Sequence, residues 1–241
     1  MPRFFITEEN FSDGRIVLSG DDANHISRSL RSKTGEKITV CDYFNYEYLC
    51  TIEKITAEKV VLTIDQKRTS QSELSAKTKL FCAVLKGDKN ELVIQKAVEL
   101  GVNEIVFFQS ENCVSRPDEK AAKNKLERWN KISLEAAKQC GRAFVPSVSG
   151  IIRFEEISKY MPQESLKLFC YEKESDVGLM SLLKRCEKEI CFVTGPEGGF
   201  SPKEADIASK SGLVSVSLGN RILRAETAPL YVMSCIAFLF G

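Results

Sequence analysis

From Leu80 onward, short apolar runs alternate with segments of helical periodicity. Strands buried on both faces need continuous apolar runs, whereas covering helices need one apolar stripe, so this alternation is typical of a parallel sheet with helices on its faces. Between the first two runs, Asp88 can cap a helix that reaches Leu100 and stops at Gly101. We therefore expect an α/β domain whose strands include residues 80–85, 104–108, 166–171, 190–194 and 213–218.

Two further helices are predicted in this part of the chain. In residues 118–140 apolar side chains recur at steps of three and four, which leaves the charged side chains on the outer face. The stretch from Arg116 to Arg142 holds eight Lys or Arg against four Asp or Glu, but a basic helical face is more often a solvated surface than an RNA site. Residues 228–241 are 14 uncharged residues, fewer than the roughly 20 that span a bilayer, so they predict a buried terminal helix.

The first 65 residues follow a different pattern, in which short β-rich runs alternate with turns. Only residues 21–32 have the spacing of a helix. We expect a small β-barrel with one inserted helix, followed by a polar linker at residues 65–79. The expected barrel strands are residues 4–6, 15–18, 37–42, 46–55 and 59–64.

Composition narrows the classes of function. Lys and Arg number 34 against 33 Asp and Glu, so any surface for nucleic acid must be local. The nine cysteines include no C-x-x-C pair and His25 is the one histidine, so we expect buried thiols and no metal site. Residues 1–6 lack the apolar core of a signal peptide, and we expect a cytoplasmic protein.

A glycine-rich turn follows the strand at residues 190–194. Gly195, Gly198 and Gly199 permit backbone torsions and close approaches that side chains would block. Ser201 and Glu204 then form a capping-box pattern, with proline at the first helical position. The turn matches neither the G-x-G-x-x-G nor the G-x-x-x-x-G-K-[ST] fingerprint. Taken alone, it fits a tight strand-to-helix connection as well as a ligand-binding loop.

A second turn of this kind, residues 217–229, follows the next strand. In parallel α/β sheets the ligand crevice lies beyond the carboxyl ends of the strands, so both turns are expected at one edge. A standard dinucleotide-binding enzyme uses the first such turn of its sheet, so two turns at the end of the chain argue against that class.

Through these two turns and four further segments, the chain resembles the SPOUT class of S-adenosylmethionine-dependent RNA methyltransferases and, within it, the RsmE family of 16S ribosomal RNA (uridine-N3)-methyltransferases. Asn220 departs from the proline that is more common at its position in the family, which concerns only the stiffness of the loop. The segments that carry the resemblance are residues 2–5, 25–31, 95–102, 135–142, 195–199 and 223–228.

The resemblance implies a PUA-like RNA-binding β-barrel at residues 1–70 and a SPOUT methyltransferase domain with a trefoil knot at residues 73–241. It also implies a homodimer that methylates N3 of one uridine in the 16S rRNA of the small ribosomal subunit, with S-adenosylmethionine bound in the knot. The cofactor contacts that it implies are Thr194, Gly195, Pro196, Glu197, Gly198, Gly199, Leu218, Gly219, Asn220, Ile222, Leu223, Thr227 and Ala228.

Uracil N3 carries a proton at neutral pH, so the enzyme must help to remove it or stabilise the resulting anion. Arg224, in the second turn, is the first candidate for that electrostatic role. Glu226 and Glu197 are candidates for bases or orienting groups, or they cap the adjacent helices.

Five residues are expected to contact RNA. His25, Arg28 and Arg31 are spaced as on one helical face, although a lone histidine is more often structural. Arg142 either reaches a phosphate or acts as a cation at the end of its helix, and Arg3 is expected to join the phosphate contacts.

Two alternatives remain open. A non-catalytic RNA-binding or ribosome-assembly protein could retain the barrel and the basic helix, and an enzyme could use another nucleotide. Two intact glycine-rich turns favour the methyltransferase.

Overall fold

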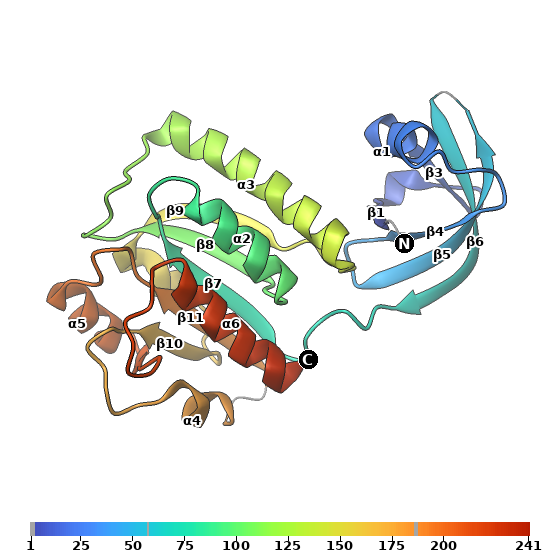
Figure 1. The fold of residues 1–241 in the computed structure, drawn as a ribbon. Helices are drawn as coiled ribbons and strands as arrows, with labels where there is room; N and C mark the ends of the chain where they lie inside the picture. Colours follow the sequence, from blue (N-terminus) through green and yellow to red (C-terminus); the bar gives the residue numbers. More distant parts are fainter. Residues whose placement is uncertain (1–2, 57, 186–187) are drawn as a thin grey trace. The chain divides into compact units, whose positions relative to one another are not determined.

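The computed structural model describes residues 3–56, 58–185 and 188–241 (Figure 1). The chain divides into two compact units. Unit 1 consists of Met1–Glu73 and Ala137–Val145, and unit 2 consists of Leu74–Ala136 and Pro146–Gly241.

Unit 1 is a six-stranded sheet in the order β1-β4-β5-β6-β3-β2. The pairing of β1 with β4 is parallel and the others are antiparallel. The sheet curls around an apolar core to which α1 and η2 contribute Ala23 and Ile26, so the expected barrel with an inserted helix is confirmed (Figure 1). Its elements are β1 (Arg3–Phe5), η1 (Glu8–Asn10), β2 (Phe11–Ser12), β3 (Arg15–Ser19), α1 (Gly20–Asn24), η2 (His25–Ser29), β4 (Lys37–Cys41), β5 (Tyr46–Ile55) and β6 (Lys59–Thr69).

Two details of unit 1 differ from the expectation. The helix expected at residues 21–32 is the short helix α1 followed by the π-helical turn η2, and it ends early because Arg31 adopts the left-handed conformation (φ 53°). The linker expected at residues 65–79 is shorter, because β6 continues to Thr69, with Gln66 to Thr69 paired to β5, and the next strand begins at Lys77. Polar residues can extend a strand where both of its faces are wet, and there the polarity of the segment was misleading.

Unit 2 contains a sheet of six parallel strands in the order β12-β10-β11-β7-β8-β9. The five expected strands are confirmed, and β9 was missed. Of its residues only Val148 is buried, and it includes Gly150, so the edge strand lacks an apolar run. The strands are β7 (Lys77–Ala83), β8 (Glu104–Gln109), β9 (Ser147–Arg153), β10 (Leu166–Cys170), β11 (Glu189–Thr194) and β12 (Val214–Val216).

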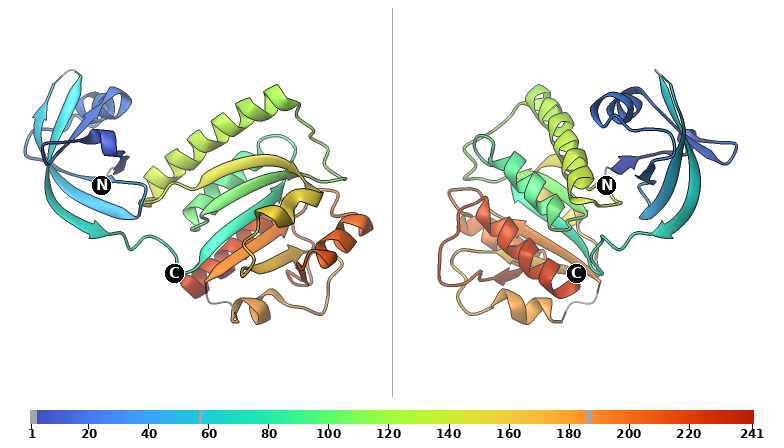
Figure 2. Two further views of the ribbon diagram at one scale, coloured as in Figure 1. Left: turned by 180° about the vertical axis from the view of Figure 1, so that it is seen from behind. Right: turned by 45° about the vertical axis from the view of Figure 1, so that its right-hand side comes forward.

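Helices cover both faces of this sheet. Figure 1 shows α2, α3 and α6 on one face, and the view from behind in Figure 2 shows η3 and α5 on the other. The terminal helix buries Val232 and Ile236 as expected, but Phe238 is 84% exposed. The helices are α2 (Lys89–Glu99), α3 (Glu119–Cys140), η3 (Phe154–Tyr160), α4 (Leu179–Leu183), α5 (Pro202–Lys210) and α6 (Thr227–Phe240).

The described cysteines are free and mostly buried, as the composition predicted, while Cys186 lies outside the described residues. Burial raises the pKa of Cys82 and of Cys170 to about 12, so these thiols are protonated and behave as core side chains. Within the described ranges, each helix is too short or too polar to cross a lipid bilayer.

Candidate functional site

A cavity of about 620 Å³ lies beyond the carboxyl ends of β10, β11 and β12 in unit 2. The two turns that the sequence singled out both contribute to its wall, so they do meet at one sheet edge. The expected cofactor residues that line it are Gly195, Pro196, Glu197, Gly198, Gly199, Leu218, Gly219, Ile222, Leu223 and Ala228.

Three expected cofactor residues are outside this lining. Thr194 is buried at the end of β11, Asn220 is exposed, and Thr227 is the first residue of α6. Of the three candidate catalytic residues, Arg224 and Glu197 line the cavity and Glu226 is outside the lining.

The first turn joins β11 to α5 through the expected capping box. The Glu204 amide donates to Ser201 Oγ at 3.2 Å, and the Ser201 amide donates to Glu204 Oε2 at 2.9 Å. Ser110 Oγ also donates to the buried Glu204 carboxylate, at 2.8 Å, so the start of α5 is fixed to the end of β8. The turn is therefore anchored at its carboxyl end.

The glycines of the first turn are required by neighbouring protein atoms. A Cβ atom on Gly195 would lie 2.8 Å from the Phe200 ring, and one on Gly198 would lie 3.1 Å from Asn112 Cβ. Gly199 has a φ of +66° and its Cα faces the Glu172 carboxylate. The sequence left a tight connection and a ligand-binding loop open for this turn. The protein's own side chains occupy the space beside these glycines, and the three glycines also line the cavity.

The second turn connects β12 to α6 and is fixed mainly at its two ends. At the first end the Ser217 amide donates to Val177 O at 2.8 Å. At the second, the Thr227 and Ala228 amides donate to Arg224 O at 2.8 and 3.0 Å, which starts α6. The backbone of Arg224 is thus part of the helix start, while its side chain is exposed on the cavity wall.

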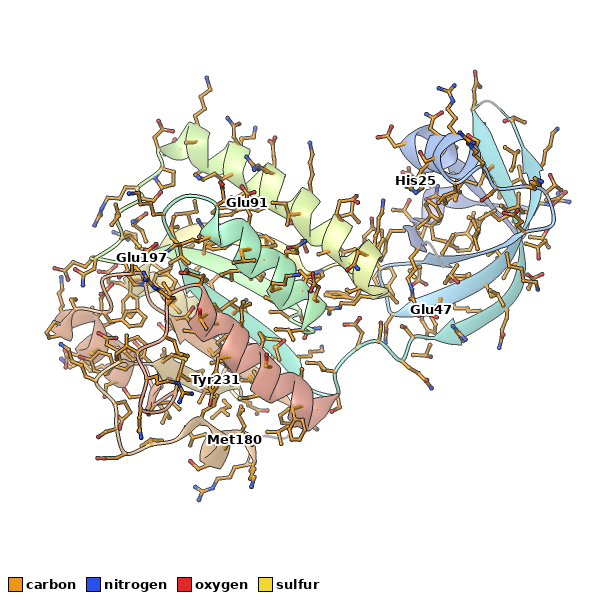
Figure 3. All side chains as sticks on the ribbon, in the orientation of Figure 1. His25, Glu47, Glu91, Met180, Glu197 and Tyr231 are labelled. Carbon is orange, nitrogen blue, oxygen red and sulfur yellow. The ribbon has the colours of Figure 1, made fainter. Side chains whose placement is uncertain are left out.

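Glu197 and Glu226 are both near Lys89, the first residue of α2. Burial alone would raise the pKa of each carboxyl, but backbone hydrogen bonds and Lys89 hold both pKa values below the usual range. Figure 3 shows Glu197 near the N-terminal end of α6. Both carboxylates are therefore ionised at neutral pH, and neither is tuned to accept a proton from a weak acid. Glu226 is the N-cap residue of α6 but makes no capping hydrogen bond with its side chain.

Sequence reasoning missed one wall of the cavity, which comes from the end of β10 and the loop after it. The signal was available, since residues 166–171 were recognised as a strand whose carboxyl end faces the crevice. The lining residues that were not predicted are Cys170, Tyr171, Glu172, Glu174, Ser217, Arg221 and Ala225.

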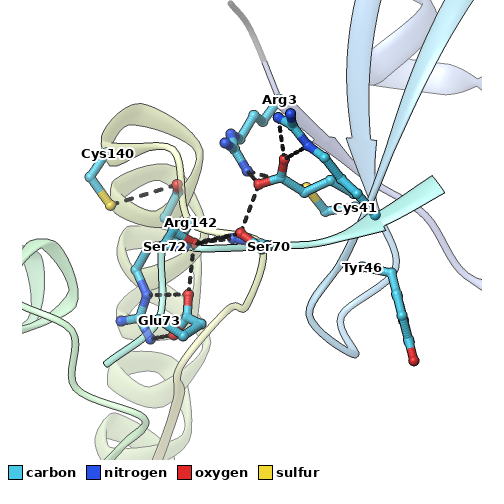
Figure 4. Close-up of polar contacts among 12 residues, drawn as sticks. Arg3, Cys41, Tyr46, Ser70, Ser72, Glu73, Cys140 and Arg142 are labelled. Carbon is cyan, nitrogen blue, oxygen red and sulfur yellow. Dashed lines mark hydrogen bonds and ion pairs between the residues drawn. The ribbon is translucent and has the colours of Figure 1, made fainter. Parts of the chain in front are cut away.

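Two of the five expected RNA contacts are occupied by ion pairs inside unit 1 (Figure 4). Arg142 is 2% exposed and its guanidinium pairs with Glu73. Arg3 pairs with Glu47, which also accepts from Arg68 at 2.8 Å. Because both arginines already pair with carboxylates, of which Glu47 is buried and Glu73 is partly buried, this geometry gives them a structural role and does not support the phosphate contacts expected for them.

The other three expected RNA contacts, His25, Arg28 and Arg31, are exposed on unit 1. The His25 ring packs edge-on against the Phe4 ring, with 6.0 Å between the centroids. Arg31 follows the end of η2, so it does not share a helical face with the other two in the way the spacing predicted.

Comparison with known proteins adds the family context. The family model described as "RNA methyltransferase domain" matches residues 72–237, and "RNA methyltransferase PUA domain" matches residues 18–65. The chain is 32% identical to ribosomal RNA small subunit methyltransferase E of Bacillus subtilis, over 99% of this chain and 96% of that protein. It is 34% identical to the protein of the same name from Mesomycoplasma hyopneumoniae, over 98% and 99% of the two chains.

Solved structures agree with the sequence relatives. The fold is similar to that of a ribosomal RNA small subunit methyltransferase E from Neisseria gonorrhoeae bound to S-adenosyl methionine, with a TM-score of 0.88 and 33% identity over 100% and 98% of the two chains. A Legionella pneumophila protein described as a methyltransferase in complex with the cofactor SAM matches with a TM-score of 0.85 and 28% identity over 98% and 97% of the chains.

Proposed function

The chain belongs to the ribosomal RNA small subunit methyltransferase E family of RNA methyltransferases, and from this membership we propose that it methylates N3 of one uridine in 16S rRNA with S-adenosylmethionine as the methyl donor. The observation that carries the proposal is the cavity between the two turns at the carboxyl edge of the parallel sheet.

The residues around the cavity fit this cofactor. The volume of about 620 Å³ lies in the range of small-molecule sites, roughly 300–1,000 Å³. Leu218, Ile222 and Leu223 provide apolar wall for an adenine ring, and the Glu172 carboxylate can face a cationic group. We propose that the expected cofactor contacts, including Thr194, Asn220 and Thr227 at the margins, act together around this cavity.

In the proposed reaction the bond between methyl carbon and sulfur breaks, its electron pair stays on sulfur, and a new bond forms between the carbon and N3 while N3 loses its proton. The bound cofactor supplies an electrophilic methyl group. The chain's task is to hold the uracil in line with that group. We propose that Arg224 faces the uracil carbonyls and stabilises the negative charge that develops on them.

The ionised carboxylates suggest roles for Glu197 and Glu226 other than accepting the N3 proton. Their lowered pKa values make them weak bases. We propose that they orient the two turns and that the N3 proton leaves to solvent, with Arg224 making its loss easier.

We propose that residues 1–70 bind RNA, with His25, Arg28 and Arg31 as exposed contacts. Residues 73–241 are proposed as the methyltransferase domain that contains the knot. Replacing Arg28 and Arg31 by Ala should weaken RNA binding and flatten its dependence on salt, because each lost phosphate contact lowers the number of released counterions. Affinity for S-adenosylmethionine should stay unchanged. If the dependence of RNA affinity on salt concentration is unaltered, these arginines are solvated surface residues that do not contact RNA.

We also propose that the protein acts as a homodimer in the cytoplasm. The supporting feature is the apolar outer side of α6 and the preceding turn, where Phe238 is 84% and Ile222 is 81% exposed. Light scattering during gel filtration should give the mass of two chains, and a monomer at micromolar concentration would contradict the dimer.

The function itself is tested by incubating the protein with S-adenosylmethionine and either 16S rRNA or small ribosomal subunits, followed by mass mapping of the RNA. One uridine should gain one methyl group, placed on N3 by its altered chromatographic and fragmentation behaviour. Binding of S-adenosylmethionine without any methylation would favour another substrate. Absence of cofactor binding would favour the non-catalytic assembly protein.

A further inference from the structure

Three chain segments of unit 2 meet at one ammonium group. Lys89 Nζ, at the start of α2, lies 3.3 Å from Glu197 Oε1 in the first turn and 3.1 Å from Glu226 Oε2 at the end of the second. We propose that Lys89 is a positioning residue that holds the two cofactor turns at their working separation. The proposal rests on the function given above, since it assigns a role within the same site.

The placement of Lys89 is unfavourable without its partners. A cation in the first turn of a helix opposes the positive end of the helix dipole. The two carboxylates compensate for this. The Lys86 amide, in the loop between β7 and α2, also donates to the same Glu197 oxygen, at 3.1 Å. The segment from Lys86 to Lys89 therefore contacts Glu197 in the first turn through both a backbone amide and a side-chain ammonium.

The Glu226 carboxylate depends on Lys89 more strongly than the Glu197 carboxylate does, because Glu197 also accepts the Lys86 amide. Among the described residues, the Glu226 Oε2 atom is buried and accepts no hydrogen bond, so the ammonium 3.1 Å away is its close partner. Removing the ammonium would leave a buried carboxylate oxygen unpaired and would place two like charges near each other. The second turn, which ends at Glu226, would then be pushed away from the first.

Among the described residues, two carboxylates, a guanidinium and a thiol take part in the electrostatics of this cluster. Glu197 and Glu226 pair with Lys89, Arg224 adds an attractive contribution at Glu226, and the charge of Glu197 acts on the buried Cys82 thiol. Because that thiol is protonated throughout the neutral range, only the two carboxylates respond when the pH is lowered.

The test compares Lys89→Met, which keeps the length of the side chain but removes its charge, with Lys89→Arg, which keeps the charge. Lys210→Met is the matched control, because Lys210 is paired with Asp206 on the exposed side of α5. Calorimetry with S-adenosylmethionine and with S-adenosylhomocysteine measures binding, and hydrogen exchange reports opening of residues 195–199 and 219–227.

Lys89→Met should bind both compounds about tenfold more weakly and exchange faster in both turns, while Lys89→Arg and Lys210→Met stay within about threefold of wild type. Adding Glu226→Gln to Lys89→Met should restore most of the affinity, because the repulsion and the unpaired charge are both removed. The loss in Lys89→Met should also shrink as pH falls from 7 to 5, since one carboxyl then takes up a proton.

If wild type fails to bind S-adenosylmethionine, the proposed function itself is wrong. If wild type binds and folded Lys89→Met binds equally well, with unchanged exchange in the two turns, Lys89 does not position them. Weaker binding that Glu226→Gln fails to relieve, at any pH, would likewise overturn the proposal, because it would point to a general loss of packing.

Discussion

The two turns that line the cavity of unit 2 differ in how the protein holds them. In the first turn, Pro196 is buried, the Phe200 ring packs against Gly195, and the Asn112 amide donates to the carbonyls of Gly198 and Gly199 at 3.3 and 3.1 Å. In the second turn, a Cβ atom on Gly219 would meet no other atom within 4 Å. Its middle also carries Ile222, which is 81% exposed.

This difference indicates a division of labour. A turn whose carbonyls and glycines already have protein partners keeps its shape without a ligand, whereas a turn fixed only at its ends has few contacts to lose when it opens. The first turn is therefore a preformed half of the site. We expect the second turn, which carries Arg224, to be the half that changes more when a ligand or partner binds, because it is fixed mainly at its ends.

The largest effect, on the methylation rate, is expected from Arg224→Ala. This change removes the guanidinium of the second turn and leaves the first turn intact. The saturated methylation rate should fall on the order of 100-fold to 1,000-fold, as for other preorganised groups aimed at developing charge. Single-turnover methylation of small ribosomal subunits, with RNA and cofactor both saturating, measures this. The deficit should shrink as pH rises, because solvent then assists loss of the N3 proton.

Arg224→Lys serves as the control for charge, and it should recover part of the rate. A variant that raises KM but keeps a normal saturated rate at every pH would reduce Arg224 to a binding residue. The second turn would then contribute to binding and not to the chemical step.

A pair of substitutions sharpens the contrast in packing. Gly199→Ala should lower the free energy of unfolding by about 2–4 kcal/mol, because the residue has a φ of +66° and the new methyl group meets the Glu172 carboxylate. Gly219→Ala should cost only about 1–2 kcal/mol, because its φ of +102° is strained but the space around it is open. Urea unfolding of both variants gives the comparison, and equal costs would mean that the turns are equally well packed.

Much of this architecture was predictable because the apolar pattern reports burial directly. The central strands of unit 2 are buried on both faces and stand out as apolar runs, and the capping box at Ser201 fixes the start of α5. The first turn was found for the same reason, since it follows such a strand. The second turn follows the short edge strand β12, of which only Val216 is buried. Strand β9 was missed because an edge strand with one wet face has no such run.

Contacts between distant residues were not predictable from local pattern. Arg142 was expected at RNA, but its guanidinium pairs with Glu73, and only folding brings residues so far apart in sequence together. Lys89 likewise shows nothing unusual in its own segment, and its importance depends on two carboxylates more than 100 residues away along the chain. The Glu172 wall was missed because its loop has no glycine-rich signature.

A smaller effect is expected from Asn112→Ala, which removes the side chain that holds the first turn from outside. Two hydrogen bonds to turn carbonyls are lost, each worth about 1 kcal/mol or less because both sites are exposed and water can replace the amide. Affinity for S-adenosylmethionine should fall a few-fold, with faster hydrogen exchange at residues 195–199 and none of the change at 219–227. Equal loosening of both turns would contradict their independence.

The smallest effect concerns acid stability and compares one carboxylate from each turn. Both Glu197 and Glu226 have a pKa below the usual value, so the stability that they contribute is fully present above about pH 4.5 and is lost as pH falls through the folded-state pKa. Since both side chains are partly exposed, each contribution should stay below about 1 kcal/mol. Wild type should therefore lose slightly more stability between pH 7 and pH 4 than Glu197→Gln or Glu226→Gln does. Glu197→Gln should show the larger difference, because Glu197 also accepts the Lys86 amide, which ties the preformed turn to a second loop. Urea unfolding at the two pH values measures both differences, and a larger difference for Glu226→Gln would mean that the second turn is the more firmly anchored of the two.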